Sequence, residues 1–254
     1  MTLSVSVIIP TFNRAAFLRE ALESVQRQTC APSEIIVVDD GSTDETRAVA
    51  RAFGDSVTYL YQTRRGPGAA RNAGIDRARG AMFAFLDDDD IWLANGIERC
   101  IARLTNPDAP QVELVIGLLQ RVRRATNAAH ETYWQRLGQP WGAMSFSGAL
   151  IPRAVLQRVG RLDETVLYGE DIDWYMRARE LGVRIAILEQ VTTLYRRHEN
   201  NLTNDFATTR AYLLKALSKS LARRAQNSQV ELRDLVEMPT PEMLQNLGRA
   251  SQDQ

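Results

Sequence analysis

The sequence predicts an α/β protein with a mostly parallel sheet flanked by helices. Short β-branched runs alternate with segments whose apolar residues recur at helical spacing, beginning with strand-like Val5–Pro10 and helical Ala15–Gln28. Polar clusters follow three of the runs, at Thr11–Asn13, Asp39–Asp40 and Asp87–Asp90. This alternation favours right-handed crossovers and a parallel sheet, whose ligands bind at the carboxyl ends of the strands.

The N-terminal half contains four predicted strands separated by helices. The strands are expected over Val5–Pro10, Glu34–Val38, Val57–Tyr61 and Met82–Leu86. Asn13 is placed to cap the first helix. Ser42 and Glu45 have the spacing of a capping box for a helix that ends near Phe53, and a third helix is expected over 66–78.

The C-terminal half has a less regular pattern. After a helix over about 94–104, strands are expected over Val112–Gln120, Ser147–Pro152, Val183–Leu188 and Val191–His198. Two further helices are expected, one ending at Gly160 and one that opens near Tyr168 and ends at Gly182, a candidate C′ glycine. Residues 121–141 are polar with scattered aromatic residues and no clear period, so we expect a long loop or lid there.

The composition excludes several classes of protein. The 31 basic and 31 acidic residues cancel, so no overall field favours nucleic acid, and we expect no nucleic-acid partner. Cys30 and Cys100 resemble neither a disulfide framework nor a zinc site, which fits a reducing cytoplasm. We find no signal peptide and no stretch of about 18 apolar residues. The expected location is cytoplasmic or at the inner membrane face, with at most peripheral membrane contact.

The octet Phe85–Trp92 has the densest charge in the sequence, because it contains four consecutive aspartates, which directly follow an apolar run. If the strand persists past Leu86, Asp87 and Asp89 point to the same side of the sheet. Crowded carboxylates raise one another's pKa and repel, which favours a bound cation, and a hard divalent ion suits oxygen ligands. The alternative is a solvated acidic loop.

The segment from Asp205 to Gln254 changes character. It contains an apolar stripe at helical spacing beside a basic row, formed by Leu213, Leu214, Leu217 and Leu221 and by Lys215, Lys219 and Arg223. Such a helix lies on a membrane surface, or it packs on its own domain or a partner subunit with its charges in water. We therefore expect a domain over 1–204 and a helical C-terminal extension over 205–254, through which a homodimer could form.

Five sequence blocks, in one order, resemble the family 2 glycosyltransferases, which have the GT-A fold with a Rossmann-like, mostly parallel sheet. The blocks lie within Val5–Asn201 and are Val7–Arg14, Val37–Asp44, Gly68–Gly74, Phe85–Asp90 and Glu170–Asp171. The resemblance implies a nucleotide-diphosphate sugar donor, a divalent metal (Mn²⁺ or Mg²⁺), and transfer to an acceptor hydroxyl with inversion at the anomeric carbon. Residues 1–204 would then be the catalytic domain.

The same resemblance implies which residues bind the nucleotide. In similar enzymes the second aspartate of the Asp39–Asp40 pair hydrogen-bonds the base; otherwise Asp40 is a turn residue before a helix. Phe12 is placed to stack on the base or to pack in the core. Arg71 reaches the base or diphosphate with its planar guanidinium, or lies on the surface of its helix. The predicted nucleotide-binding residues are Pro10, Thr11, Phe12, Asn13, Asp40, Arg71, Asp87 and Asp88.

Metal ligands follow from the Asp-x-Asp pattern of the family. The ligands predicted from this pattern are Asp89 and Asp87, with Asp87 binding the ribose or assisting the metal. His198, which follows the last predicted strand, is a further candidate ligand. Because four aspartates are consecutive, the register is open by one, and Asp88 with Asp89 is the alternative pair. Arg196 and Arg197 follow the last predicted strand and are expected to close over the diphosphate, as is His198.

Asp171 is the predicted general base, with Glu170 as its substitute. The alternative is that both acids only favour a helix N-terminus electrostatically. Trp134 and Trp141 are candidates to stack on acceptor sugar rings. The expected acceptor is a saccharide or a lipid-linked saccharide in cell-surface polysaccharide or glycoconjugate synthesis.

Other classes of function remain as rivals. Processive synthases of this type carry a Gln-x-x-Arg-Trp block and transmembrane helices, and the sequence has neither, so we expect one sugar per encounter, with UDP-sugars favoured. A nucleotidyltransferase that makes sugar nucleotides would need a basic, glycine-rich loop after the first strand, and the sequence has no such loop there. A catalytically silent nucleotide-sugar-binding module would not require Asp87–Asp90 and Asp171.

Overall fold

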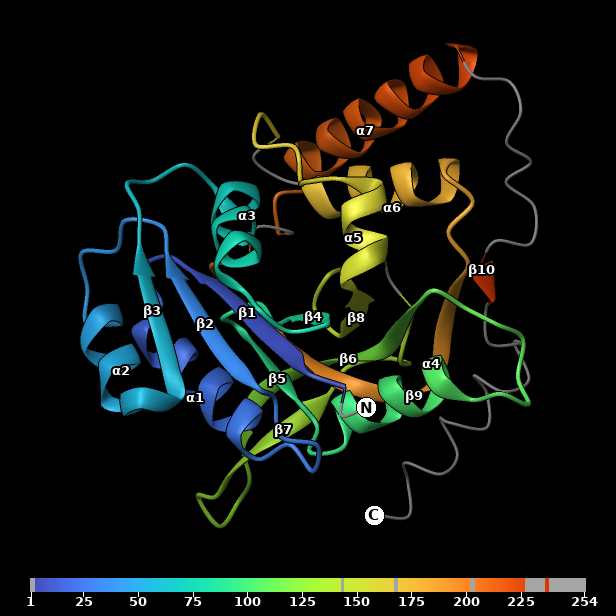
Figure 1. The fold of residues 1–254 in the computed structure, drawn as a ribbon. Helices are drawn as coiled ribbons and strands as arrows, with labels where there is room; N and C mark the ends of the chain where they lie inside the picture. Colours follow the sequence, from blue (N-terminus) through green and yellow to red (C-terminus); the bar gives the residue numbers. More distant parts are fainter. Residues whose placement is uncertain (1–2, 143, 167–168, 202–203, 227–235, 238–254) are drawn as a thin grey trace.

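The computed structural model describes residues 3–142, 144–166, 169–201, 204–226 and 236–237. Within these residues, one ten-stranded sheet runs through the molecule in the order β10-β9-β6-β8-β4-β1-β2-β3, with β5 paired to β9 and β7 to β6 (Figure 1). The strands are β1 Val5–Thr11, β2 Glu34–Asp39, β3 Val57–Tyr61, β4 Met82–Phe85, β5 Asp90–Trp92, β6 Leu114–Thr126, β7 Thr132–Arg136, β8 Ala149–Pro152, β9 Ile185–Arg196 and β10 Val236–Glu237.

Helices cover both faces of the sheet, as the alternation of elements predicts. The α-helices are α1 Ala15–Gln26, α2 Thr46–Ala52, α3 Pro67–Arg77, α4 Gly96–Thr105, α5 Arg153–Val159, α6 Glu170–Glu180 and α7 Phe206–Gln226, and a 3₁₀ turn spans Gly54–Ser56. One layer holds α1, α2 and α4, the opposite layer holds α3, α5 and α6, and α7 lies outside α6 (Figure 1).

Side-chain alternation along β1 divides the core in two. Ile8 faces the layer of α3, α5 and α6, whereas Val7 and Ile9 face the layer of α1, α2 and α4. All three side chains are fully buried, as expected for a central parallel strand with both faces covered. Cys30 and Cys100 are free thiols that pack with the second layer.

Strand pairing brings the predicted polar clusters to one edge. β1 pairs in parallel with β2 and with β4, and Thr11 lies opposite Asp39 at the carboxyl ends of β1 and β2. β8 runs antiparallel between β4 and β6, while β6, β9 and β10 are mutually parallel. The mostly parallel sheet of the prediction is confirmed.

Both N-cap predictions are wrong. Asn13 adopts a left-handed backbone with φ of 51°, and its Oδ1 accepts a hydrogen bond from the Thr43 amide at 2.8 Å, so Arg14 occupies the N-cap of α1. Ser42 accepts from the Asn13 amide at 2.8 Å instead of capping α2. Glu45 occupies the N-cap of α2 without a side-chain cap hydrogen bond, and Asp44 Oδ1, one residue earlier, accepts from the Thr46 amide at 3.0 Å.

The expected long loop over 121–141 is also wrong. β6 continues to Thr126 and forms an antiparallel hairpin with β7, in which Val122 lies opposite Arg136. β6 persists because β9 satisfies its backbone as far as Val122, which pairs with Arg196. The two strands expected over 183–198 form the single strand β9, which shifts register against β6 near Leu118.

The helix ends at two glycines are confirmed. Gly160 and Gly182 follow α5 and α6 with φ of 89° and 71°, where a residue without Cβ is favoured. α6 begins at Glu170, and Tyr168, expected near its start, lies outside the described residues. The strand that leads to the aspartates ends at Phe85, and Asp88 and Asp89 lie in a turn. The alternation of side chains expected past Leu86 therefore does not hold.

The extension contributes α7 and the two-residue strand β10, and the rest of 227–254 lies outside the described residues. α7 packs on its own domain, but with the opposite face from the one expected. Lys219 and Arg223 of the basic row turn inward, whereas Leu214 and Leu221 are 54% and 63% exposed. In the part of the chain that the structure describes, no helix has the length and apolar composition needed to cross a membrane.

We expect Gly74→Ala to lower the free energy of unfolding by about 1–2 kcal/mol. A Cβ atom at position 74 of α3 would lie 2.5 Å from Cγ2 of Ile8, which is fully buried. Alanine gains about 1 kcal/mol over glycine in helix propensity, but overpacking a core costs up to about 3 kcal/mol, so the clash outweighs the gain. Denaturant unfolding measures the change. Exposed Arg77→Ala in the same helix is the control, expected within about 0.5 kcal/mol of wild type; an equally stable Gly74→Ala would contradict the packing described.

Candidate active site

One large cavity lies at the carboxyl ends of β1, β2 and β4 and extends to α6, α7 and β6, with a volume of about 1430 Å³. Ten of the predicted site residues line it: Pro10, Thr11, Phe12, Asp40, Arg71, Asp87, Asp88, Asp89, Glu170 and Asp171. Asn13 and His198 lie outside its wall. The tertiary structure thus gathers into one cavity residues that come from five separate sequence blocks.

Asp40 is fixed at the end of β2 by the loop before α3. Its Oδ1 accepts hydrogen bonds from Gln62 Nε2 at 2.7 Å and the Arg65 amide at 2.8 Å, and its Oδ2 accepts from the Gly66 amide at 2.8 Å. A carboxylate offers about four acceptor positions, so Oδ2 retains one for a ligand. Phe12 lies on the same wall, and the guanidinium of Arg64 sits over its ring at 3.8 Å.

Arg71 joins the two acidic sides of the cavity. Its side chain is buried and pairs with Asp87, after β4, and with Glu170, at the start of α6. Burial alone would lower the pKa of Arg71, but the charges of Asp87 and Glu170 outweigh it and raise that pKa. The alternative of a surface arginine is excluded by this burial.

Asp171 follows Glu170 in the first turn of α6, which begins after Gly169 in a left-handed conformation. Burial, and then the negative charge of Glu170, raise the pKa of Asp171 to about 7. Burial also raises the pKa of Glu170, against the charge of Arg71. A carboxyl group that titrates near neutral pH is suited to take up and release a proton.

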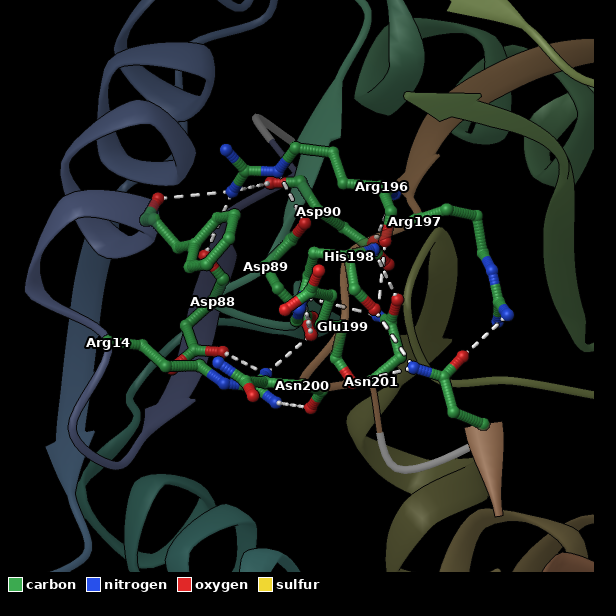
Figure 2. A network of polar contacts seen from close by, with 12 residues as sticks. Arg14, Asp88, Asp89, Asp90, Arg196, Arg197, His198, Glu199, Asn200 and Asn201 are labelled. Carbon is green, nitrogen blue, oxygen red and sulfur yellow. Dashed lines mark hydrogen bonds and ion pairs between the residues drawn. The ribbon is translucent and has the colours of Figure 1, made fainter. Parts of the chain in front are cut away.

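Asp88, Asp89 and Asp90 are all buried at the turn between β4 and β5 (Figure 2). Arg14 of the α1 N-terminus pairs with Asp88 at 3.1 Å and also with Asp89, which in turn lies 3.1 Å from His198 Nε2. Asp90 is held from the other side, where its Oδ2 accepts from the Ser147 hydroxyl at 2.8 Å.

The three neighbouring carboxyl groups have divergent pKa values. Burial and the charge of Asp89 raise the pKa of Asp88 to about 7. Burial would raise the pKa of Asp89 as well, but its hydrogen bond to His198 and the charge of Arg14 lower it. Burial and the charge of Asp89 hold the pKa of Asp90 well above its usual range. Asp89 is therefore the member of this group that stays ionised most readily.

The position of Arg196 corrects its expected role. It is fully buried, and its guanidinium donates to the backbone carbonyls of Asp88, Asp89 and Asp90 and pairs with Glu20 at 2.7 Å (Figure 2). It supports the backbone of the acidic turn on the side away from the cavity, and it does not line the cavity. Arg197, by contrast, lines the cavity.

No group of three or more His, Cys, Asp or Glu side chains among the described residues is arranged to hold a metal ion. Asp89 Oδ2 and His198 Nε2 lie 3.1 Å apart and supply one oxygen and one nitrogen donor, a set that suits Mn²⁺. In proteins, the coordination shell of Mg²⁺ commonly consists of one or two protein ligands, substrate phosphates and water. The pair fits a cation bound in this way, whereas Asp87, turned toward Arg71, is not joined to it.

Several cavity residues were not predicted from the sequence. Arg14 lies in the first quoted block, so its position at a helix start was the available signal. The far wall is apolar and aromatic, and it includes Leu119, Trp141, Met144, Met176, Tyr195, Tyr212 and Leu213. Of the two candidate acceptor tryptophans, Trp141 lines the cavity with Arg121 over its ring at 4.5 Å, whereas Trp134 does not line it.

Comparison with known proteins identifies the family. The family model described as glycosyl transferase family 2 matches residues 6–160. The chain belongs to glycosyltransferase family 2. An uncharacterized glycosyltransferase of Rickettsia prowazekii is 34% identical over 186 residues, which cover 67% of this chain and 57% of that protein. The family 2 chain therefore spans little more than half the length of this relative.

Solved structures share the GT-A fold with this family 2 chain. A mannosyltransferase from Pyrobaculum calidifontis, in complex with GDP-Man and Mn²⁺, superposes with a TM-score of 0.67 at 19% identity, covering 91% of this chain and 67% of that one. Residues 1–349 of S. aureus TarS, in complex with UDP-GlcNAc, give a TM-score of 0.61 at 22% identity, covering 80% and 61%. Both proteins bind a nucleotide sugar in these structures.

We expect Arg14→Gln to raise the affinity of the nucleotide-free protein for Mn²⁺ at least about fivefold. The Arg14 guanidinium pairs with Asp89, the carboxylate that with His198 fits a cation, and like charges a few ångströms apart repel by on the order of a few kcal/mol near a protein surface. Calorimetric titration of Mn²⁺ measures the change. Arg19→Gln, an exposed arginine of the same helix, gives the same change in net charge and should leave the affinity unaltered. Equal affinities for all three proteins would mean that Arg14 does not oppose the metal.

Proposed function

We propose that this family 2 glycosyltransferase transfers one sugar, with inversion, from a nucleotide-diphosphate sugar to an acceptor hydroxyl. The observation that carries the proposal is the single cavity in which Asp40 and Asp87–Asp89, at the carboxyl ends of the strands, face Asp171 at the start of α6. Ligands of open α/β sheets bind at this edge. The cavity has room for a nucleotide sugar beside a second substrate.

The donor half of the cavity is the part around β1 and β2. Asp40 keeps one acceptor position for an N–H of the base, and Phe12 offers a ring face beside it. We propose a UDP-sugar as the donor because uracil has one ring N–H between two carbonyl groups, which a single free acceptor fits. Thymine shares this N–H, whereas guanine presents more than one N–H on the same edge. GDP and dTDP sugars are the alternatives for the same pocket.

We propose that Asp89 and His198 contribute to a site for Mn²⁺ or Mg²⁺. When bound, the ion would neutralise negative charge on the departing nucleoside diphosphate. The residues on this side supply the other fixed charges, since Arg71 holds Asp87 and Arg14 holds Asp88. The ionised state of Asp89 at neutral pH supports its part in the site.

Asp171 is the proposed general base. The acceptor oxygen attacks the anomeric carbon from the face opposite the leaving group, the bond from that carbon to the diphosphate oxygen breaks, and the acceptor proton passes to Asp171. Attack from the opposite face inverts the configuration. The raised pKa of Asp171 supports this role, because it places the proton acceptor near the working pH.

The acceptor half of the cavity has a different lining from the donor half. Trp141, Tyr195 and Tyr212 present aromatic surface, which suits sugar rings, and Arg121 and Arg197 add positive charge. We propose a saccharide acceptor carried on an anionic lipid, used in the synthesis of a cell-surface polysaccharide or glycoconjugate. The mixed lining supports a molecule with sugar, phosphate and apolar parts.

We expect one nucleoside diphosphate to bind with a clear dependence on the metal. Calorimetric titration of UDP, GDP and dTDP, each with and without Mn²⁺, should show UDP binding at least about tenfold more tightly with the metal, since phosphate oxygens complete its coordination. Asp89→Asn should lose this metal effect. Asp76→Asn, an exposed carboxylate on α3, is the control. Metal-independent or absent binding of all three nucleotides would contradict the proposed donor site.

We expect the pH dependence of turnover to report Asp171. A base must be deprotonated to act, so kcat/KM should fall about tenfold per pH unit below the pKa of about 7 and level off above it. Asp171→Asn should bind UDP like wild type, lose about 10²-fold or more in kcat, and lack this acidic limb. Hydrolysis of the donor by water provides an assay without the acceptor. An unchanged acidic limb in Asp171→Asn would assign the titration to another group.

A further inference from the structure

α7 presents an apolar stripe to the outside of the molecule. Leu213, Leu214, Leu217 and Leu221 lie on one side of the helix, and their exposed fractions are 40%, 54%, 40% and 63%. Figure 1 shows α7 at the outer edge, beyond α6. We call these four residues the leucine stripe. A contiguous exposed apolar surface on a folded domain commonly marks an interaction site.

The leucine stripe is not needed to hold α7 on the domain. The inward side of α7 buries the small residue Ala216 and is otherwise held by polar contacts. Lys219 pairs with Asp163, and Ser220 donates to Glu180 at 2.6 Å. Arg223 donates to Glu180 at 2.6 Å and also pairs with Asp173. A surface helix usually buries its apolar face. Here the salt bridges hold the helix in the reverse orientation and leave the leucines outside.

Charge around the leucine stripe identifies the kind of surface that it fits. α7 has five basic residues and no acidic one. Two of the basic residues point inward, and Arg210, Lys215 and Arg224 are exposed. By helical spacing, Arg210 and Arg224 lie on the side of the leucines. Two copies of this face would bring like charges together. An anionic lipid surface offers both apolar depth for the leucines and opposite charge for the cations.

The leucine stripe is continuous with the cavity. Leu213 belongs to the stripe and also lines the cavity, together with its neighbours Thr209 and Tyr212 on α7. A surface that covers the stripe therefore meets the acceptor end of the cavity. An acceptor anchored in that surface would reach the cavity without leaving it.

We propose that the leucine stripe, with Arg210 and Arg224, docks this protein on an anionic phospholipid bilayer and holds the mouth of the cavity against it. The docking itself is independent of the proposed function. Delivery of a lipid-anchored acceptor to the cavity rests on that function. The leucines enter the interfacial region, and the basic side chains bind lipid phosphates.

Vesicle flotation with the full chain tests the docking. The protein should float with vesicles that contain phosphatidylglycerol and much less with pure phosphatidylcholine, and raised salt should weaken the binding because it screens the charges. The triple variant Leu214→Gln/Leu217→Gln/Leu221→Gln leaves the cavity-lining Leu213 in place and should bind at least about tenfold more weakly. Tyr133→Gln, an exposed aromatic of β7, is the control and should bind like wild type.

Two further measurements make the outcome decisive. Thermal unfolding and donor hydrolysis without vesicles should be the same for the triple variant and wild type, because the changed side chains are exposed and lie outside the cavity. Failure of donor hydrolysis in wild type would oppose the proposed function and leave the docking intact. Absence of wild-type flotation on anionic vesicles would overturn the docking. A wild-type dimer that the triple variant abolishes, without flotation, would assign the stripe to a second copy.

Discussion

Buried pairing between arginine and carboxylate side chains makes this cavity possible. A buried carboxylate without a counter-charge costs several kcal/mol, and the cavity is lined by Asp87–Asp89 on one side and by Glu170 and Asp171 on the other. Arg71 neutralises one side of this cluster and Arg14 the other. The acidic cavity is therefore stable only because arginines from two different helices meet there.

The same pairs connect the fold to the proposed chemistry. Arg71 links the end of β4 to the first turn of α6, so it fixes the distance between the donor side and Asp171. Arg196 holds the turn of Asp88–Asp90 through backbone carbonyls, which leaves the carboxylates of Asp88 and Asp89 free to face Arg14 and His198. Removing one of these cations would alter several carboxyl groups together, because their charges interact strongly.

α7 illustrates a second use of ion pairs. Lys219 and Arg223 fasten the helix to acids of the loop before α6 and of α6 itself, and this orientation turns the leucines outward. The resulting apolar surface adjoins the acceptor side of the cavity through Leu213. Stability of the extension and exposure of its apolar face thus have one cause.

The amino-acid sequence alone predicts the α/β class, most strands and helices, and the polar clusters at the ends of β1, β2 and β4, because periodicity and turn residues are local signals. It did not determine the roles of Asn13 and Arg196, the β6–β7 hairpin or the orientation of α7. Those depend on partners distant in the chain, such as Thr43, the carbonyls of Asp88–Asp90, β9 and Glu180. These features follow from tertiary contacts, since a side chain buries its charge or satisfies its hydrogen bonds against whatever the fold places beside it.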